Sequence, residues 1–213
     1  MSAFPIDPPL PSHVKRLLVV GGTFDPPHRA HVRLALAAAA AARCDHVLFV
    51  PARQSPLKDE PLSPAAHRLA MLRLALEGEP RASVSTFEID QCRTSYTIDT
   101  LQALRAALPE YVELFLFMGS DQLRSLDRWR QAERVVELAR PVVVLRPPDT
   151  RESLRAAGVE KRRLQWIHEV PVDEVSSTQV RERIARGQDA SGLVEPRILA
   201  YLRAHHLYES GES

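Results

Sequence analysis

Short runs of aliphatic and β-branched residues alternate along the chain with stretches in which apolar residues recur every three or four positions. The first pattern is typical of buried strands and the second of amphipathic helices. The pattern predicts strands at 17–20, 46–50, 84–89, 114–118, 142–145 and 164–170, and helices at 30–42, 64–76, 96–108, 129–139 and 152–157. Such alternation predicts an α/β fold, a Rossmann-like doubly wound parallel sheet with right-handed crossovers.

The pattern changes after the last predicted strand, where two helices follow at 178–186 and 196–205. They predict a small helical C-terminal subdomain. The proline-rich start of the chain lacks the basic and apolar segments of a signal peptide, so we expect a flexible tail there. The predicted organisation is a tail, an α/β domain and a helical subdomain, at 1–13, 14–175 and 176–213.

Composition argues against nucleic acid and membranes as partners. Lys and Arg number 28 against 27 Asp and Glu, a formal net charge of +1, which argues against a broad nucleic-acid surface. No apolar run reaches the length of a membrane span, so we expect no membrane partner. Cys44 and Cys92 have no paired spacing, which fits a reduced cytoplasmic location. Assembly into a homo-oligomer stays open.

The candidate chemistry begins at 21–31, Gly-Gly-Thr-Phe-Asp-Pro-Pro-His-Arg-Ala-His, directly after the first strand. Gly21 and Gly22 let the backbone approach a ligand closely, and the prolines favour a turn into a helix whose N-terminal N–H groups attract anions. His28 and His31 are spaced to share one helix face. Ligands bind at the carboxyl ends of strands in such sheets, so the segment predicts a phosphate site.

Three other kinds of ligand site and an ordinary turn are the alternatives for this segment. A zinc pair of the metalloprotease type needs glutamate after the first histidine and i, i+4 spacing, whereas this chain has Arg29 and i, i+3. A dinucleotide fingerprint needs a third glycine, and a P-loop needs Gly-Lys-Ser/Thr. The plain alternative is an ordinary strand-to-helix turn with two half-exposed histidines.

A second predicted anion site opens the C-terminal subdomain. Ser176, Ser177 and Thr178 stand at a predicted helix start, and Arg181 follows on the same face. Helix capping alone is the alternative for the hydroxyls. Lys58, in a proline-rich loop after the second strand, could reach a phosphate or simply be solvated.

Candidate binding residues also follow the carboxyl ends of the third and fourth predicted strands. Residues 95–101, Ser-Tyr-Thr-Ile-Asp-Thr-Leu, open a helix with hydroxyls and N–H groups. Asp121, just after Gly119, could bind ribose hydroxyls or cap a helix. Trp129 could stack on a flat ring or pack against the sheet.

With these motifs in view, the chain resembles the nicotinate-nucleotide adenylyltransferases of the nucleotidyltransferase group. The resemblance runs nearly end to end and is carried by motifs at 21–31, 67–72, 95–101, 119–129, 176–181 and 192–208. The Ser-Tyr-Thr-x-Asp-Thr-Leu segment is the most family-specific. The chain departs from the family pattern at Ala30, where glycine is usual, and at Leu57, where histidine is frequent.

The resemblance implies transfer of AMP from ATP to nicotinate mononucleotide, giving deamido-NAD and pyrophosphate. It implies catalytic roles for His28, His31, Lys58 and Arg181, and Mg²⁺ held through substrate phosphates rather than a protein cage. It places ATP against Gly21, Gly22, Thr23, Phe24, Gly119, Asp121, Ser176, Ser177 and Thr178, and the acceptor against Asp25, Thr97, Trp129 and Arg130. The alternatives are a related enzyme with another acceptor, nicotinamide mononucleotide or phosphopantetheine, and a non-catalytic nucleotide-binding regulator.

Overall fold

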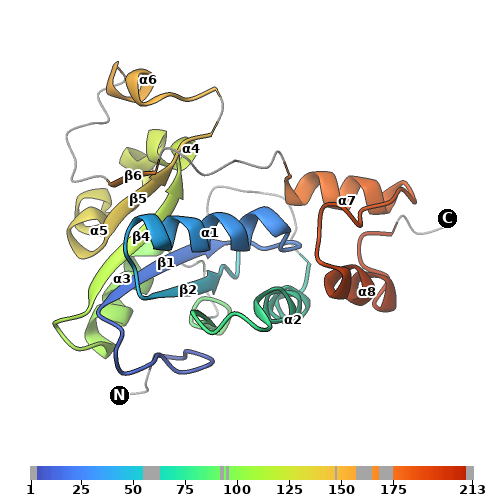
Figure 1. Cartoon of the computed structure of the whole chain (residues 1–213), viewed down its shortest axis with the longest axis horizontal. Helices are drawn as coiled ribbons and strands as arrows, with labels where there is room; N and C mark the ends of the chain where they lie inside the picture. Colours follow the sequence, from blue (N-terminus) through green and yellow to red (C-terminus); the bar gives the residue numbers. More distant parts are fainter. Residues whose placement is uncertain are drawn as a thin grey trace.

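The computed structural model describes residues 4–54, 63–91, 94, 96–146, 148–156, 165–167 and 175–209. Within these residues, a six-stranded sheet has the order β3-β2-β1-β4-β5-β6, with every neighbouring pair parallel (Figure 1). The strands are β1 (Arg16–Gly22), β2 (His46–Pro51), β3 (Ala82–Val84), β4 (Glu113–Gly119), β5 (Arg140–Val144) and β6 (Gln165–Ile167). The predicted doubly wound parallel fold is confirmed.

Apolar residues on the two faces of the sheet form two separate cores. One core lies under α1 (Arg29–Ala41) and α2 (Ala65–Leu76), and the other under α3 (Thr97–Ala107) and α5 (Ala132–Leu138). All six residues of β2 are buried, because helices cover both faces of a parallel sheet. Burial on both faces therefore explains the runs of aliphatic residues in the sequence.

The strand order reverses between β1 and β4, which pair with each other at the centre of the sheet. Chain connections leave these two strands toward opposite faces, so a crevice forms beyond their carboxyl ends. Gly21 and Gly22 end β1, and Gly119 ends β4. The residues with candidate chemistry therefore start from the place where this fold binds ligands.

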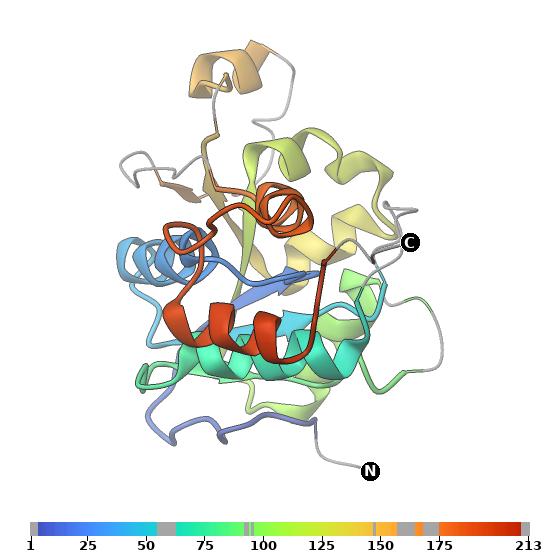
Figure 2. The ribbon, with the colours of Figure 1, turned by 90° about the vertical axis from the view of Figure 1, so that its right-hand side faces the viewer.

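Helices α7 (Ser177–Ala185) and α8 (Pro196–Ala204) stand at the carboxyl edge of the sheet, and α8 lies along α2 (Figures 1 and 2). They enclose a third apolar core, to which α2 contributes Met71. The remaining elements are α4 (Ser120–Arg124), the 3₁₀ turn η1 (Leu126–Arg128) and α6 (Arg151–Ala156). No helix in the described ranges is long and apolar enough to cross a membrane.

The third strand lies earlier than the sequence pattern predicts. β3 ends at Val84, and residues 87–90 form a turn that is closed by a 2.6 Å hydrogen bond from Thr86 Oγ1 to Asp90 Oδ2. Phe87, an apolar residue of the predicted strand, stacks instead on Phe4, with ring centroids 4.7 Å apart. The prediction of a strand at 84–89 was therefore wrong beyond its first residue.

The start of the chain also differs from the prediction of a loose tail. Asp7 forms an antiparallel bridge with Val84, and the Ser83 hydroxyl donates to the carbonyl of Pro8 at 2.7 Å. Asp7 and Pro8 therefore lie against β3 at the edge of the sheet.

Helix α5 begins three residues later than predicted. Gln131, just before it, has a φ of 53°, a left-handed conformation that interrupts the helical path. Trp129 and Arg130 consequently lie in the loop that joins η1 to α5. Of the last predicted strand, 165–167 is confirmed as β6, while 164 and 168–170 lie outside the described residues.

Candidate active site

Residues 23–28 join β1 to α1 and are called the phosphate loop below. An added Cβ at Gly22 would lie 3.0 Å from the Phe24 ring, whereas one at Gly21 would meet no atom within 4 Å. Phe24 has a φ of 49°, which is rare for a residue other than glycine, and its buried ring meets His31 edge-on. Packing under Phe24 thus explains Gly22, and the open space at Gly21 leaves room for a ligand.

His28 and His31 lie together at the start of α1, as the spacing predicts. His28 is the N-cap residue, and the two rings stack with centroids 3.6 Å apart. The backbone N–H of His28 donates to Nδ1 of His31 at 3.2 Å. Because Nδ1 accepts this bond, a neutral His31 carries its proton on Nε2, where it can donate to an anion.

The first N–H groups of α1 are partly engaged by the protein itself. The Arg29 N–H donates to the carbonyl of Leu193 at 3.3 Å, and the His31 N–H donates to the carbonyl of His28 at 3.0 Å. Ala30, where the sequence departs from the family pattern, is 1% exposed, so its methyl group packs in the core. The histidine side chains, more than these two amides, are the donors that the loop presents.

A fully buried arginine holds the phosphate loop through hydrogen bonds to backbone carbonyls. Arg68, on α2, is 1% exposed and donates to four carbonyls: those of Thr23 at 2.8 Å, Ala52 at 2.6 Å, Arg53 at 2.9 Å and Ser63 at 2.9 Å. Burial lowers the pKa of Arg68. With the Thr23 carbonyl turned toward Arg68, the amide that follows it points the opposite way.

Asp25 connects the phosphate loop to the rest of the molecule. Its carboxylate is 2% exposed, accepts from the Ser63 N–H at 3.0 Å and accepts from the hydroxyl of Tyr208. Its carbonyl accepts from Nη1 of Arg181 at 2.8 Å. The structure therefore gives this side chain a connecting role, and its contact with an acceptor stays a prediction.

The start of α7 contacts the same loop. The Ser177 hydroxyl donates to the carbonyl of Pro26 at 2.9 Å. Ser176 instead caps the helix, accepting from the Gln179 N–H at 3.2 Å while its own N–H donates to Gln179 Oε1 at 2.9 Å. Thr178 is exposed and lies 3.5 Å from Nη2 of Arg181. The second predicted anion site therefore adjoins the first.

The end of β4 brings Asp121 and Arg146 over Gly119. An added Cβ at Gly119 would lie 2.2 Å from Asp121 Oδ1 and 3.1 Å from Arg146 Nε. Nη1 of Arg146 is 3.8 Å from the same carboxylate oxygen, and both side chains are about half exposed. Any side chain at position 119 would displace the Asp121 carboxylate, and the pair above it faces solvent.

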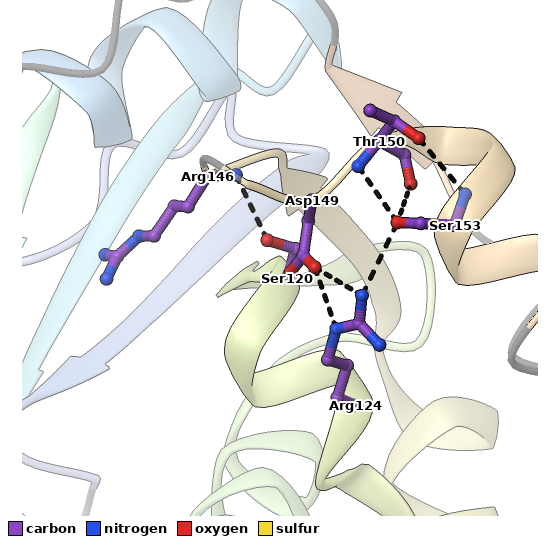
Figure 3. Close-up of polar contacts among 6 residues, drawn as sticks. All are labelled: Ser120, Arg124, Arg146, Asp149, Thr150 and Ser153. Atoms are coloured by element: carbon purple, nitrogen blue, oxygen red, sulfur yellow. Dashed lines mark hydrogen bonds and ion pairs between the residues drawn. The ribbon is translucent and has the colours of Figure 1, made fainter.

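A polar network anchors the segment that follows β5 (Figure 3). Nε of Arg124 donates to Asp149 Oδ1 at 2.8 Å, and this bond holds the pKa of Asp149 below its usual value. Ser153 and Thr150 exchange hydrogen bonds at the start of α6. The Arg146 side chain extends away from this network, while its N–H donates to the Ser120 hydroxyl at 3.0 Å (Figure 3).

Tyr96, Thr97, Trp129 and Arg130 form what we call the acceptor side. Tyr96 and Thr97 begin α3, and the Arg130 guanidinium lies 5.1 Å from the centre of the Tyr96 ring. The half-buried Trp129 packs against the neighbouring core. Its indole Nε1 is buried and has no hydrogen-bond acceptor in the described part of the chain. Of the residues that the sequence assigns to the acceptor, Arg130 thus lies over Tyr96, next to Thr97, whereas Asp25 lies in the phosphate loop.

Glu88 lies beside the acceptor side, next to the first turn of α3. It is 8% exposed, and its Oε1 accepts from the Thr100 hydroxyl at 2.6 Å. Burial raises the pKa of Glu88 above its ordinary value. A carboxyl group that resists ionisation thus lies close to the predicted carboxylate pocket.

The structure joins the predicted residues of the phosphate loop, α1 and α7 into one cluster, while Lys58 lies outside the described residues. Three further residues reach this edge without having been assigned a role: Arg68, Arg146 and Tyr208. Arg68 and Tyr208 fall within matched motifs, and Arg146 directly follows a strand end, which was the available signal. In the described ranges, no group of three or more His, Cys, Asp or Glu residues could hold a metal ion.

The fold and sequence are similar to those of known nucleotidyltransferases. Residues 19–183 match the model of the cytidylyltransferase-like family, which spans the sheet, the phosphate loop and the start of α7. A nicotinic acid mononucleotide adenylyltransferase from Plasmodium falciparum, complexed with NaAD, has a similar fold. The TM-score is 0.75 at 19% identity, and the alignment covers 91% of this chain and 97% of that one.

Sequence relatives give the particular family. A "Probable nicotinate-nucleotide adenylyltransferase" of Roseiflexus sp. is 41% identical over 197 residues, covering 89% of this chain and 96% of its own. A protein of the same name from Pseudomonas entomophila is 36% identical over 212 residues, covering 92% and 96%. The chain belongs to the nicotinate-nucleotide adenylyltransferase family.

Proposed function

We propose that the protein transfers the adenylyl group of ATP to nicotinate mononucleotide, forming deamido-NAD and pyrophosphate in NAD biosynthesis. The proposal is carried by the 41% identity with a relative of that name over about nine-tenths of the chain. The stacked histidines at the centre of the carboxyl edge agree with it, because they offer donors to a phosphate where the fold binds ligands.

In the proposed reaction, a 5′-phosphate oxygen of the mononucleotide attacks the α-phosphorus of ATP. A bond forms between them as the bond from the α-phosphorus to the bridging oxygen breaks, and the electron pair leaves with pyrophosphate. The attacking oxygen is already ionised at neutral pH, so no general base is required. The protein therefore acts by positioning and by stabilising negative charge.

We assign the charge stabilisation to His28 and His31. The hydrogen bond to Nδ1 of His31 supports a donor role for Nε2 toward the α- and β-phosphates. Arg181 is assigned to the β- and γ-phosphates and the departing pyrophosphate, with Lys58 as its proposed partner. Gly21 and the remainder of the phosphate loop would line the same side of ATP.

Magnesium is proposed as the cofactor. The described donors do not form a cage for it, since the Asp25 carboxylate already accepts from Ser63 and Tyr208. The ion would bind through substrate phosphates and water, and when bound it would neutralise charge on those phosphates.

The acceptor side would hold the nicotinate ring. The Trp129 indole offers a flat face, and the N–H groups at the start of α3 together with Arg130 suit a carboxylate. An amide would turn an NH₂ group toward those donors, so nicotinamide mononucleotide should bind less well. Asp121 is proposed to bind the adenosine ribose, beside Gly119 and Arg146.

The helical subdomain, 176–213, is proposed to complete the ATP site through Ser177 and Arg181. We propose a cytoplasmic location, which the buried free thiol of Cys44 supports. We assign no nucleic-acid or membrane partner, and the number of copies in solution is left to direct measurement.

The test compares acceptors. Purified protein with ATP and Mg²⁺ is expected to release pyrophosphate with nicotinate mononucleotide, and at least tenfold more slowly, in kcat/KM, with nicotinamide mononucleotide. Tenfold corresponds to about 1.4 kcal/mol, which mismatched donors readily cost. Phosphopantetheine serves as a third acceptor. Equal kcat/KM values for the two pyridine mononucleotides would contradict the proposed selectivity, and turnover with phosphopantetheine alone would contradict the proposed reaction.

A further inference from the structure

The end of the chain reaches back to the phosphate loop through a single side chain. Tyr208 lies four residues beyond α8, and its hydroxyl donates to Oδ1 of Asp25, 183 positions earlier in the sequence. Asp25 lies between Phe24, which packs on Gly22, and Pro26, whose carbonyl Ser177 binds. The contact therefore falls in the middle of the turn that carries His28 into the site.

The backbone around Tyr208 adopts a conformation that side chains ordinarily avoid. Tyr208 has a φ of 66° and His206 a φ of 49°, both in the left-handed region that favours glycine. Such a conformation is unfavourable for a residue with a side chain, and it persists where surrounding contacts hold it. For Tyr208 these contacts are the third core, against which its ring packs, and the bond to Asp25.

The partner of Tyr208 is a buried carboxylate, for which the loss of a donor is costly. Asp25 is 2% exposed, and it accepts from the Tyr208 hydroxyl on Oδ1 and from the Ser63 N–H on Oδ2. Burial, followed by the bond to Asp25, raises the pKa of Tyr208, so the hydroxyl keeps its proton and stays a donor. With one donor lost, the carboxylate would turn toward the nearby cationic groups, Arg68 and Arg181.

We infer that Tyr208 is a positioning residue: by holding the Asp25 carboxylate, it fixes the turn that presents His28 and His31 to the phosphates of ATP. The inference rests on the proposed function, because it names a residue that sets the geometry of the same site. It acts through Asp25 and the loop, and it requires no contact between Tyr208 and a substrate.

Tyr201 supplies a matched control within the same subdomain. It is also half-buried against the third core, and its hydroxyl lies 2.9 Å from Nδ1 of His67 on α2. Both tyrosines thus join the helical subdomain to the α/β domain by one hydroxyl. Only Tyr208 bonds to the phosphate loop.

The experiment compares Tyr208→Phe with Tyr201→Phe, which each remove one hydroxyl and keep the ring. Three quantities are measured: ATP affinity by calorimetry in the presence of Mg²⁺, steady-state kcat and KM with nicotinate mononucleotide, and the thermal midpoint. Rates are taken well below the midpoint and expressed per folded molecule. This separates loss of positioning from loss of folded protein.

For Tyr208→Phe we expect ATP affinity and kcat to fall by roughly tenfold each, the change associated with one hydrogen bond to a charged group. KM for the mononucleotide should stay within about twofold, because the acceptor side is untouched. Tyr201→Phe should lower the thermal midpoint by a similar amount and leave ATP affinity and kcat near wild type. A purely structural role of Tyr208 would not produce this split.

Wild-type ATP affinity and kcat in Tyr208→Phe would overturn the inference, since the ring alone would then account for its packing. Equal losses in both variants would also overturn it. If the wild-type protein binds ATP but does not turn over nicotinate mononucleotide, the proposed function fails, and the calorimetric comparison still decides the role of Tyr208.

Discussion

The phosphate loop and the acceptor side lie on the same edge of the sheet but are built differently. In the phosphate loop, the carbonyls of Thr23, Asp25 and Pro26 are bound by Arg68, Arg181 and Ser177. On the acceptor side, Arg130 is exposed above the Tyr96 ring, and the Trp129 indole N–H has no acceptor within the described ranges. One region is cross-linked by the protein's own hydrogen bonds, and the other leaves the Arg130 guanidinium exposed.

The difference matches the two tasks of the proposed reaction. Stabilising charge at the α-phosphorus needs donors that are already in place, because reorganising them during the reaction would raise the barrier. Choosing an acceptor needs groups that are satisfied only when the correct ligand arrives. The comparison therefore predicts that substitutions in the first region affect stability and kcat, and that those in the second affect KM for one substrate.

The largest effect is expected from Arg68→Met. This change removes four hydrogen bonds to buried carbonyls, and removing one partner of such a buried charged network costs about 3–5 kcal/mol. For a chain of this size, the thermal midpoint should fall by roughly 10 °C. Arg73→Met is the control on the same helix, because its exposed pair with Asp7 should contribute about 1 kcal/mol or less. Similar midpoints for the two variants would refute the supporting role of Arg68.

His31→Ala should leave the fold intact and lower kcat on the order of 100- to 1000-fold, as expected for the loss of a donor to transition-state charge. Pyrophosphate release measures the rate, and thermal denaturation checks the fold. The exposed His13→Ala is the control. Near-normal turnover of the His31 variant would remove it from the mechanism.

Trp129→Leu tests the acceptor side alone. Leucine keeps part of the packing and removes the aromatic face, whose stacking is worth about 0.5–1.5 kcal/mol. KM for nicotinate mononucleotide should rise roughly three- to tenfold, while KM for ATP changes by less than about twofold. An equal rise in both constants would show that Trp129 supports the whole edge rather than the acceptor.

The smallest effect is expected from Glu88→Gln. Because burial raises the pKa of Glu88 in the folded protein, its favourable contribution is present below the ordinary glutamate pKa and is lost as pH rises through the raised value. The neutral amide can still accept from Thr100. The variant should therefore unfold at a slightly higher temperature than wild type near pH 8 and at the same temperature near pH 4. The exposed Glu110→Gln should show no such difference, and a lower midpoint at pH 8 would contradict the burial argument.

The sheet and the histidine pair were predictable because their signals are local. A run such as 47–50 is apolar because both of its faces are buried, and the i, i+3 spacing of His28 and His31 places both on one helix face. The third strand was misplaced because Phe87 and Ile89 continue the apolar pattern inside a turn. Nothing local in the sequence indicates that Phe87 stacks on Phe4.

The connections across the site could not be predicted from pattern. Arg68 is a basic residue in the first turn of α2, and arginine ordinarily faces solvent. Its four carbonyl partners come from two connections, β1 to α1 and β2 to α2, which only the folded chain brings together. Tyr208 and Asp25 are likewise remote in sequence, and their bond depends on a left-handed backbone that no propensity indicates.

The bridge between Asp7 and Val84 has a consequence for how the protein behaves at high concentration. β3 is an outer strand, and its outward N–H and carbonyl groups would otherwise be a template for a strand of another molecule. The Val84 N–H donates to the carbonyl of Asp7, and the Asp7 N–H donates back to Val84, at 2.8 and 2.9 Å. The backbone at Asp7 therefore occupies part of this edge and leaves less of it for pairing with another molecule.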